Sequence, residues 1–217
     1  EIIGKLEKGQ VLEGTVKNLT IDGSIEIDEP FKSNVGGLAG YMDCSNASID
    51  NCISDVNIYL SGEDMQAGGL FGEIIVSDGE LQIRNCKMTG LISMAGTNSA
   101  LAGLAAFSKG TVEISDCSVK GELWQTGAVS YVGGIVGNAY YSNFKAERCS
   151  VLGESRIEEA GMISGIANTS SASDLQIEDC IVAGELTLSS DAASVFGITH
   201  STENSTVKNC FDYLKVM

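Results

Sequence analysis

Cysteine is the residue with the clearest chemical potential in this chain, because six of the seven cysteines recur at a regular spacing. Each ends a short segment such as Ile83-Arg84-Asn85-Cys86, and successive members lie 30 to 34 residues apart. This cysteine column is Cys52, Cys86, Cys117, Cys149, Cys180 and Cys210. Val16-Lys17-Asn18-Leu19 repeats the segment with leucine in place of cysteine. Such a column could form disulfides, bind a metal ion or fill a core.

The regular spacing argues against the first two of these roles. Equivalent residues in neighbouring coils of a β repeat stack about 4.8 Å apart with parallel side chains, whereas a disulfide needs Cβ atoms about 3.8 Å apart. A straight column offers no tetrahedral zinc geometry, and the chain has no C-x-x-C pair. We therefore expect reduced, buried thiols, Cys117 and Cys149 among them. Cys44 lies outside the column and is the cysteine that we expect to be most reactive.

Two carboxylates at equivalent positions could form a catalytic pair. Glu147 and Glu178 each lie two residues before a column cysteine, and stacking would place them about 5 Å apart, as in a retaining glycosidase. Arg148 and Lys208 lie beside them and would keep both ionised, which leaves no general acid with a raised pKa. The single histidine, His200, offers little for a triad or a zinc site, and no HExxH or GxSxG motif is present. A carbohydrate-active β-helix enzyme, either a lyase or a glycoside hydrolase, is therefore the alternative interpretation.

A second set of carboxylates follows a column of glycines. Glu122, Glu154 and Glu185 each come directly after a glycine. Like charges one coil apart destabilise a sheet unless a cation relieves them. Calcium could do so, or the side chains of Lys120 and Arg156. We expect the second arrangement, and we expect no cofactor.

Four aromatic residues form the predicted binding patch. Trp124, Tyr131, Tyr140 and Tyr141 fall in one repeat and its loop. Exposed aromatic rings can stack on sugar rings or anchor a protein partner. The expected partner is therefore a host glycan or a host protein.

The elements that must position these residues follow from the same repeat of about 32 residues. The segment that enters each cysteine is one strand, and Asn or Asp directly before the cysteine predicts a turn or bulge. A glycine four residues after the column position, as at Gly90 and Gly121, predicts a corner. The alternation in Ile92-Ser93-Met94 predicts a second strand with one face inward.

The third piece of each repeat is rich in glycine. It reads Val35-Gly36-Gly37-Leu38-Ala39-Gly40 in its first copy and recurs at 67–72 and 132–137, with decayed copies at 101–106, 163–167 and 195–198. A glycine column lets another backbone or a large side chain approach closely. We expect this piece to be a strand covered on both sides. A groove on this glycine-rich face, used to bind a protein, is the alternative.

Three short strands in each of about six coils predict an all-β parallel β-solenoid, a right-handed β-helix. The predicted domain spans residues 15–217, with residues 1–14 as an N-terminal cap or lead-in. The chain has 217 residues, of which 43% are hydrophobic and 19% charged, as is typical of a globular protein. The net charge of -16 argues against nucleic acid. No apolar run is long enough to insert into a membrane.

The motif G-G-L/I-x-G, followed by an apolar and polar segment into N/D-C, resembles the GLUG repeat. The resemblance covers residues 15–210, with good copies at 36–40, 68–72 and 133–137 and weaker ones at 102–106, 164–168 and 196–200. GLUG repeats are similar to surface-protein modules of bacteria and also occur in large secreted proteins, outside the catalytic part. The resemblance implies a non-catalytic extracellular segment, a spacer or an adhesion module within a larger multidomain chain. The first residue, Glu1, also indicates a chain that has been cut.

Overall fold

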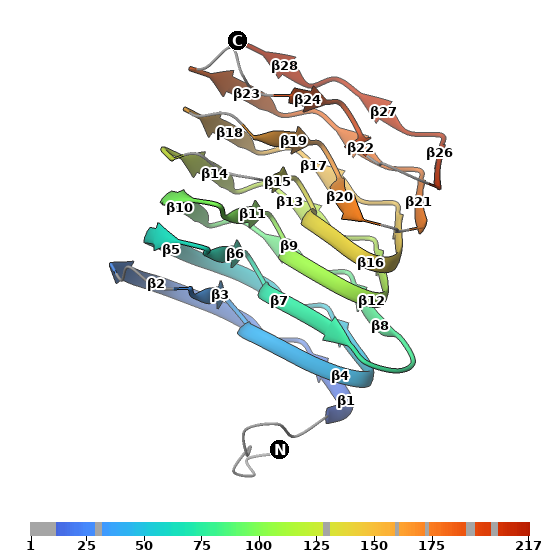
Figure 1. Cartoon of the computed structure of the whole chain (residues 1–217). Coiled ribbons are helices and arrows are strands. Elements are labelled where there is room, and N and C mark those ends of the chain that lie inside the picture. The colour runs from blue at the N-terminus through green and yellow to red at the C-terminus, as the bar shows by residue number, and fades with distance from the viewer. Residues whose placement is uncertain are drawn as a thin grey trace.

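The computed structural model describes residues 12–28, 32–127, 131–158, 161–171, 174–189, 194–200 and 204–217. Within these ranges every regular element is a β-strand, and none is a helix. Strands of successive coils pair in parallel, and the coils stack one on another from the N-terminal to the C-terminal end (Figure 1). The predicted parallel β-solenoid is confirmed. Most of the predicted lead-in at residues 1–14 lies outside the described residues.

Three sheets run along the solenoid, and each coil contributes to all three except the last, β25 to β28, which contributes to two. Sheet A consists of β1 (Leu12–Lys17), β4 (Ala39–Asp50), β7 (Phe71–Val76), β8 (Leu81–Arg84), β12 (Ala105–Ser115), β16 (Val136–Glu147), β20 (Ala167–Ser171), β21 (Asp174–Glu178), β25 (Thr199–His200) and β26 (Ser205–Lys208). Sheet B consists of β2 (Thr20–Asp28), β5 (Ile53–Glu63), β9 (Lys87–Met88), β10 (Leu91–Thr97), β13 (Ser118–Val119), β14 (Glu122–Gln125), β17 (Ser150–Val151), β18 (Glu154–Ile157), β22 (Ile181–Val182), β23 (Glu185–Leu188), β27 (Phe211–Asp212) and β28 (Lys215–Val216). Sheet C consists of β3 (Asn34–Gly36), β6 (Gln66–Gly68), β11 (Ala100–Ala102), β15 (Tyr131–Gly133), β19 (Met162–Ser164) and β24 (Ser194–Phe196).

The chain turns from sheet A into sheet B at the residue before each column position. That residue has a left-handed φ between 51° and 56° in every coil, which confirms the turn predicted there. The residues are Asn18, Asn51, Asn85, Asp116, Arg148, Asp179 and Asn209. Asn and Asp tolerate this conformation better than most residues. Their side chains also pair between coils, since Asn51 Nδ2 donates to Asn18 Oδ1 over 2.8 Å.

The core lies inside the three sheets and runs the length of the solenoid. The residues three positions before the cysteines point inward, so that Ile83 and Ile114 are completely buried. The alternation predicted for the second strand is also confirmed, because Ile92 and Met94 are buried while Ser93 between them is half-buried. Full burial of such a side chain contributes about 1.5–3 kcal/mol. The repeat therefore stabilises itself chiefly through stacked apolar columns.

The glycine-rich piece is a corner and not the single strand that the sequence predicted. In the first copy β3 ends at Gly36 and β4 begins at Ala39. The backbone N–H groups of Leu38 and Ala39 both donate to Leu70 O of the next coil, over 2.9 and 3.0 Å. A double glycine fits here because backbone packs against backbone at the corner. No space is left there for side chains.

Both glycines of the corner are crowded. A Cβ atom on Gly68 would lie 2.7 Å from Leu104 O, and one on Gly134 would lie 2.7 Å from a methyl group of Val151 in sheet B. The second glycine of each pair therefore faces inward, and Gly134 is buried. Binding of a protein at the outer side of the glycine-rich piece stays a prediction.

The glycines four residues after the cysteines are not corners between sheets. Gly90 and Gly121 interrupt sheet B, where they separate β9 from β10 and β13 from β14. Neither has a positive φ. A Cβ atom on Gly121 would overlap Gly90 O of the preceding coil. The backbone bends at both glycines, as predicted, and the close approach of stacked backbones also favours glycine at these positions.

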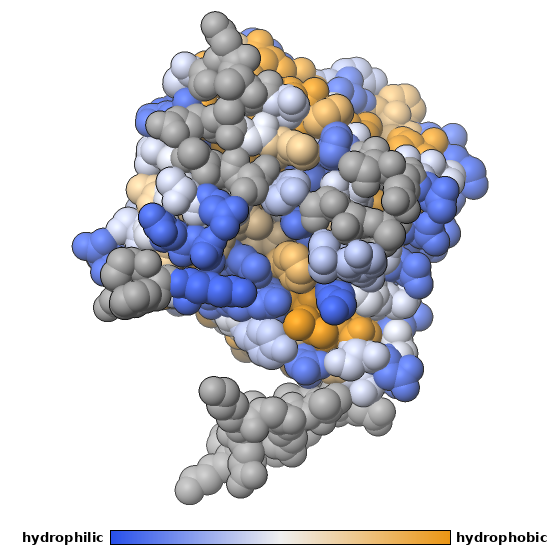
Figure 2. Space-filling model, viewed as in Figure 1, coloured by the Kyte–Doolittle hydropathy of each residue, from blue (hydrophilic) through white to orange (hydrophobic). Residues whose placement is uncertain are grey.

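The apolar columns end exposed at the two terminal coils. Val207 is 44% exposed, whereas the equivalent Ile114 in the middle is completely buried. Phe211 is 54% exposed in the last coil. Figure 2 shows hydrophobic side chains gathered near the C-terminal end, while hydrophilic side chains dominate much of the face in view.

Candidate functional site

Sheets A and C meet at the glycine corner (Figure 1). Over the coils of β6, β11 and β15 their outer faces line a groove. We call it the A–C groove. One wall is the outward column of sheet C, in which successive coils pair in register: Asn34, Gln66, Ala100, Tyr131, Met162 and Ser194. The facing wall on sheet A carries residues seven positions further along the chain: Tyr41, Glu73, Phe107 and Asn138. Each of these coils therefore contributes one side chain to each wall.

The floor of the groove is narrow because the two walls meet backbone to backbone. A Cβ atom on Gly72 would lie 2.5 Å from Val35 N, and one on Gly137 would lie 2.6 Å from Ala106 O. Backbone therefore lies close to both positions, and the small Ala106 takes the equivalent place on the coil between them. The wall residues stand above this floor and decide what the groove can hold.

The groove encloses about 390 Å³ over the coils of β6, β11 and β15. This volume falls within the range of about 300–1,000 Å³ that is usual for small-molecule sites. The lining residues are Lys32, Asp64, Gln66, Asn98, Ser99, Ala100, Phe107, Tyr131 and Asn138. Two aromatic rings and several amide groups thus share one concave surface.

The structure divides the four aromatic residues of the predicted patch between sheets. Tyr131 lines the A–C groove on sheet C. Tyr140 on β16 packs against Phe107, with ring centroids 5.8 Å apart, and Tyr141 packs edge-on against Tyr140 at 4.5 Å. Trp124 lies on sheet B, where the Arg156 guanidinium sits 5.1 Å from its ring centroid. Trp124 thus lies on a different sheet from the three tyrosines, and within the described residues no ring contact joins it to them.

Phe107 was not predicted from the sequence, yet it contacts Tyr140 and lines the same groove as Tyr131. Phe107 pairs in register with Glu73 and Asn138 on the sheet A wall. It lies seven residues after Ala100, as Tyr41 lies seven after Asn34 and Asn138 seven after Tyr131. This recurring offset was the signal that could have found it.

The polar groups of the groove include an acceptor without a partner. The Gln66 carboxamide oxygen is buried and makes no hydrogen bond within the described part of the chain. Asn98 donates to the Asp64 carboxylate at the rim. Asn34 donates to the Glu73 carboxylate across the walls, and this bond bridges the groove at its N-terminal end. The open part of the groove therefore begins at Gln66.

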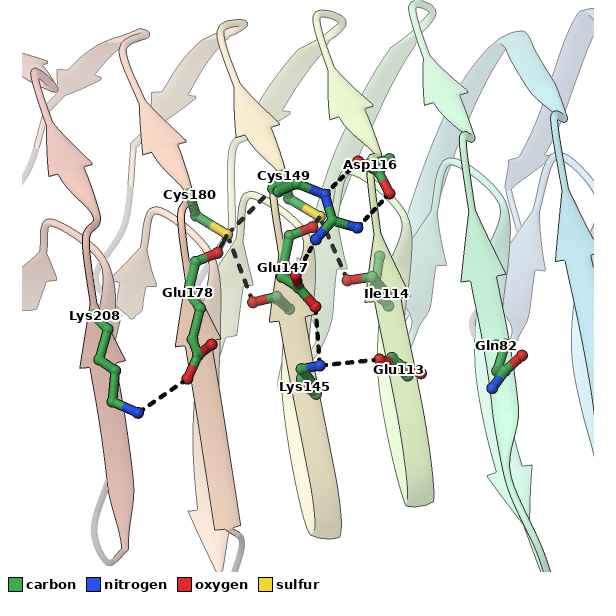
Figure 3. Close-up of polar contacts among 12 residues, drawn as sticks. Gln82, Glu113, Ile114, Asp116, Lys145, Glu147, Cys149, Glu178, Cys180 and Lys208 are labelled. Carbon is green, nitrogen blue, oxygen red and sulfur yellow. Dashed lines mark hydrogen bonds and ion pairs between the residues drawn. The ribbon is translucent and has the colours of Figure 1, made fainter.

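The carboxylate pair of the enzyme alternative lies on the outer face of sheet A (Figure 3). Glu147 and Glu178 are paired in register, as predicted. Glu147 forms ion pairs with Lys145, at 2.9 Å, and with Arg148; Glu178 pairs with Lys208 at 3.2 Å. The Lys145 hydrogen bond, aided by the charge of Arg148, lowers the pKa of Glu147. The predicted ion pairs are confirmed, and Glu147 is held as a carboxylate.

The acidic column on sheet B is in register. Glu154 pairs with Glu185, and the neighbouring residues of Glu122 and Glu154 are paired. Glu185 forms an ion pair with Lys215 of the next coil at 3.0 Å. Among the described residues no group of three or more His, Cys, Asp or Glu side chains could hold a metal ion. Arg156 lies over Trp124, so it is the Lys215 ammonium that relieves this column at its C-terminal end.

The cysteines are free thiols, and the column members from Cys52 to Cys180 are buried. Each column thiol donates to the carbonyl oxygen two residues before it, as Cys117 does to Ser115 O at 3.2 Å (Figure 3 shows the column around Cys149). Hydrogen bonding to Cys149, together with burial, raises the pKa of Cys117. Cys44 is completely buried, and burial raises its pKa, so the prediction that Cys44 is the most reactive thiol is wrong. The half-buried Cys210 in the last coil is the most accessible.

The single histidine lies at the C-terminal end of the groove floor. His200 on β25 pairs in register with Asn168 of the preceding coil. Its ring packs against Phe196, with centroids 4.6 Å apart, and its backbone N–H donates to Ser164 Oγ at 3.0 Å. The Nδ1 atom is buried and makes no hydrogen bond within the described residues. His200 therefore packs against Phe196, and in the described ranges its Nδ1 atom has no acidic partner.

Comparison of the chain with protein families, with characterised proteins and with solved structures finds no match. The resemblance to GLUG repeats thus stays a prediction. No helix in the described part of the chain is long and apolar enough to cross a membrane.

Proposed function

We propose that this chain is a non-catalytic β-solenoid module that binds a partner through the A–C groove. The observation that carries the proposal is the concave surface on which Tyr131, Phe107 and Gln66 converge from two sheets. A largely preformed cleft with aromatic faces and a few polar groups is the usual form of a ligand site. Because its walls are hydrogen-bonded strands, the solenoid holds these side chains at fixed positions before the ligand arrives.

The groove is a better candidate than a second hollow on the outer face of sheet A. That hollow has a volume of about 400 Å³ and is lined by Glu80, Thr111, Val112, Glu113, Asn143, Phe144, Lys145, Asp174 and Gln176. Its only aromatic ring, Phe144, is 1% exposed. Its cation, Lys145, is held by Glu113 and Glu147. The A–C groove instead offers the Gln66 carboxamide oxygen, which has no partner among the described residues, and the half-buried rings of Phe107 and Tyr131.

Binding is favoured over carbohydrate cleavage by the state of the paired acids. A glycosidase of the two-carboxylate type needs one acid with a raised pKa. The Glu147 pKa is lowered by Lys145 and Arg148, which is the opposite direction. These carboxylates therefore act as members of an ion-pair network on the surface.

The context that we propose is the surface of a bacterium, where the module would serve adhesion as part of a larger extracellular protein. The GLUG-like motif at 36–40, 68–72 and 133–137 supports this setting. The partner classes are a host glycan or a host protein. A spacer without a ligand of its own is the simpler variant of the same proposal.

The test is retention of the labelled chain on immobilised mucin and on a panel of extracellular matrix proteins. We expect binding to at least one of these surfaces, and weaker binding by Tyr131→Ala than by Tyr59→Ala. Tyr59 is a matched control because it is 41% exposed on the outer face of sheet B, away from the groove. Retention on none of the surfaces would leave only the spacer variant. Release of sugar from mucin, lost in Glu147→Gln, would contradict the non-catalytic proposal.

A further inference from the structure

The most informative stretch of the A–C groove lies where aromatic rings occupy opposite walls of adjacent coils. On the coil of β11 the small Ala100 faces Phe107, and on the next coil Tyr131 faces Asn138. Ala100 is 6% exposed and leaves the space beside Phe107 open on its wall. A ligand in this stretch therefore meets a ring from each side.

The polar groups around these rings suit a ligand that both donates and accepts hydrogen bonds. Gln66, Asn98 and Asn138 line the same stretch, and a carboxamide carries one acceptor oxygen and two donor N–H groups. The Gln66 oxygen is a buried acceptor without a partner in the described residues. A buried acceptor is costly unless a ligand or water donates to it. A hydroxyl group supplies such a donor and can accept from a second amide.

The charge of the groove disfavours an anionic ligand. Among the lining residues Lys32 and Asp64 carry opposite charges, and Glu73 lies on the same wall as Phe107. The whole chain carries a net charge of -16. A polyanion would therefore be repelled at long range. An anionic ligand therefore does not fit this groove.

In the stretch from Gln66 to Tyr131 the walls leave no free strand edge for a peptide. β11 is hydrogen-bonded to β6 on one side and to β15 on the other, and β12 pairs with β7 and β16. A peptide that binds by strand addition needs unpaired backbone N–H and C=O groups. Recognition in this groove must therefore come from side chains. This favours a ligand whose hydroxyl groups form hydrogen bonds and whose ring faces pack on aromatic rings.

From these observations we infer that the A–C groove binds a short neutral oligosaccharide, with one sugar ring between Tyr131 and Phe107 and hydroxyls bonded to Gln66 and Asn98. Sugar rings have apolar faces that pack on aromatic rings and hydroxyl edges that bond to amides. The stretch from Gln66 to Tyr131 covers two coil spacings, roughly 10 Å at ~4.8 Å each, which sets a short ligand along the solenoid axis. The inference rests on the proposed binding function and narrows its ligand class.

The experiment is titration of the full chain with neutral tetrasaccharides followed by NMR saturation transfer and calorimetry. The probes are cellotetraose, maltotetraose, chitotetraose and lacto-N-tetraose, and the charged comparison is sialyllactose against lactose. We expect at least one neutral probe to bind, with a Kd raised at least tenfold by Tyr131→Ala and several-fold by Gln66→Ala. Tyr59→Ala should leave the Kd within twofold of the unchanged chain.

Controls separate loss of the site from loss of the fold. Tyr131→Phe keeps the ring and should retain most of the affinity, and each variant is accepted only if its melting temperature matches the unchanged chain. If Phe107→Ala does not fold, Tyr131→Ala and Gln66→Ala still decide the matter. Binding of no neutral probe, tighter binding of sialyllactose than of lactose, or a Kd unchanged in Tyr131→Ala would each overturn the inference. Retention on a matrix protein that persists in those cases would leave the broader binding function standing.

Discussion

The residue before each cysteine explains how the coils turn at the same place every time. Six of these seven residues are Asn or Asp, which accept a left-handed φ, and the seventh is Arg148 at 52°. Arg148 makes two hydrogen bonds of 2.7 Å to the Asp116 carboxylate one coil before it. We infer that this bidentate contact offsets the conformational cost at Arg148, as paired charged groups do elsewhere. The turn before the cysteine is thus retained in this coil, although arginine replaces Asn or Asp there.

The cysteine that follows this turn is suited to its place by size and by weak polarity. Its thiol reaches a carbonyl oxygen in its own coil and, at a longer distance, one in the preceding coil, as Cys149 does with Glu147 O at 3.4 Å and Ile114 O at 3.6 Å. A larger apolar residue would lose these contacts, and a charged residue would be buried without a partner. The column is therefore structural, which agrees with the free thiols predicted from the spacing.

Thiol reactivity provides the test at this scale. In the native chain we expect one fast-reacting cysteine, Cys210, because it is the half-buried member of the set while the other six are buried. Labelling with a thiol-specific reagent under native conditions, followed by peptide mass spectrometry, measures the order of reaction. Cys210→Ser should remove the fast phase, and Cys44→Ser should leave it unchanged. A fast phase that disappears with Cys44→Ser would instead restore the prediction made from sequence.

At the scale of elements, the glycine corner decides the cross-section of the coil. The sequence predicted the repeat, the inward columns and the turn before the cysteine, because each depends on local pattern and stacking. It did not predict that the double glycine divides β3 from β4, since glycine is equally compatible with a strand crowded by neighbours. Whether the glycines form a corner or a crowded strand depends on which backbone segment packs against them, and this is decided by the tertiary structure.

The candidate site was less predictable than the fold for the same reason. Tyr131 and Tyr140 could be named from sequence because they are aromatic residues in one repeat. Their relation to Phe107 depends on the position of the corner, which brings residues seven apart to facing walls. Trp124 was grouped with them by sequence proximity, yet a strand boundary puts it on sheet B. Closeness along the chain is a poor guide to closeness around a coil.

The corner yields a prediction with a matched control inside the chain. Gly134→Ala should destabilise the protein by about 1–3 kcal/mol or more through overpacking, because the new methyl group would lie 2.7 Å from Val151 and overlap Gly165 O. Gly14→Ala should change stability by less than about 0.5 kcal/mol, as is usual for a surface position, since nothing lies within 4 Å of a Cβ there. Urea denaturation of both variants measures the difference. Equal effects would show that backbone freedom, and not crowding, is the reason for glycine at the corner.

At the scale of the whole molecule, the surface charge is organised in columns along the solenoid. Lys17, Asp50 and Arg84 are in register on sheet A, with alternating sign as predicted, and the column continues to Glu147 and Glu178 before it ends at Lys208. The last step of this column is an ion pair, between Glu178 and Lys208 at 3.2 Å, and an exposed pair of this kind contributes about 0–1 kcal/mol. The neighbouring Glu147 and Glu178 face each other, and each is paired with a cation that relieves their repulsion.

Stability should vary along the solenoid, because each coil contacts only its neighbours. Val119 in the middle is 1% exposed, whereas Val207 in the last coil is 44% exposed. In the 217-residue chain we expect Val119→Ala to cost about 2 kcal/mol of unfolding free energy, as a buried truncation does, and Val207→Ala to cost less than about 0.5 kcal/mol. Urea denaturation measures both, and amide hydrogen exchange should show protection that is highest near β12 and falls toward β26. An equal loss of unfolding free energy in the two variants, with uniform exchange protection, would mean that the terminal coil is as well packed as the centre. The exposed apolar columns at the ends would then need another explanation.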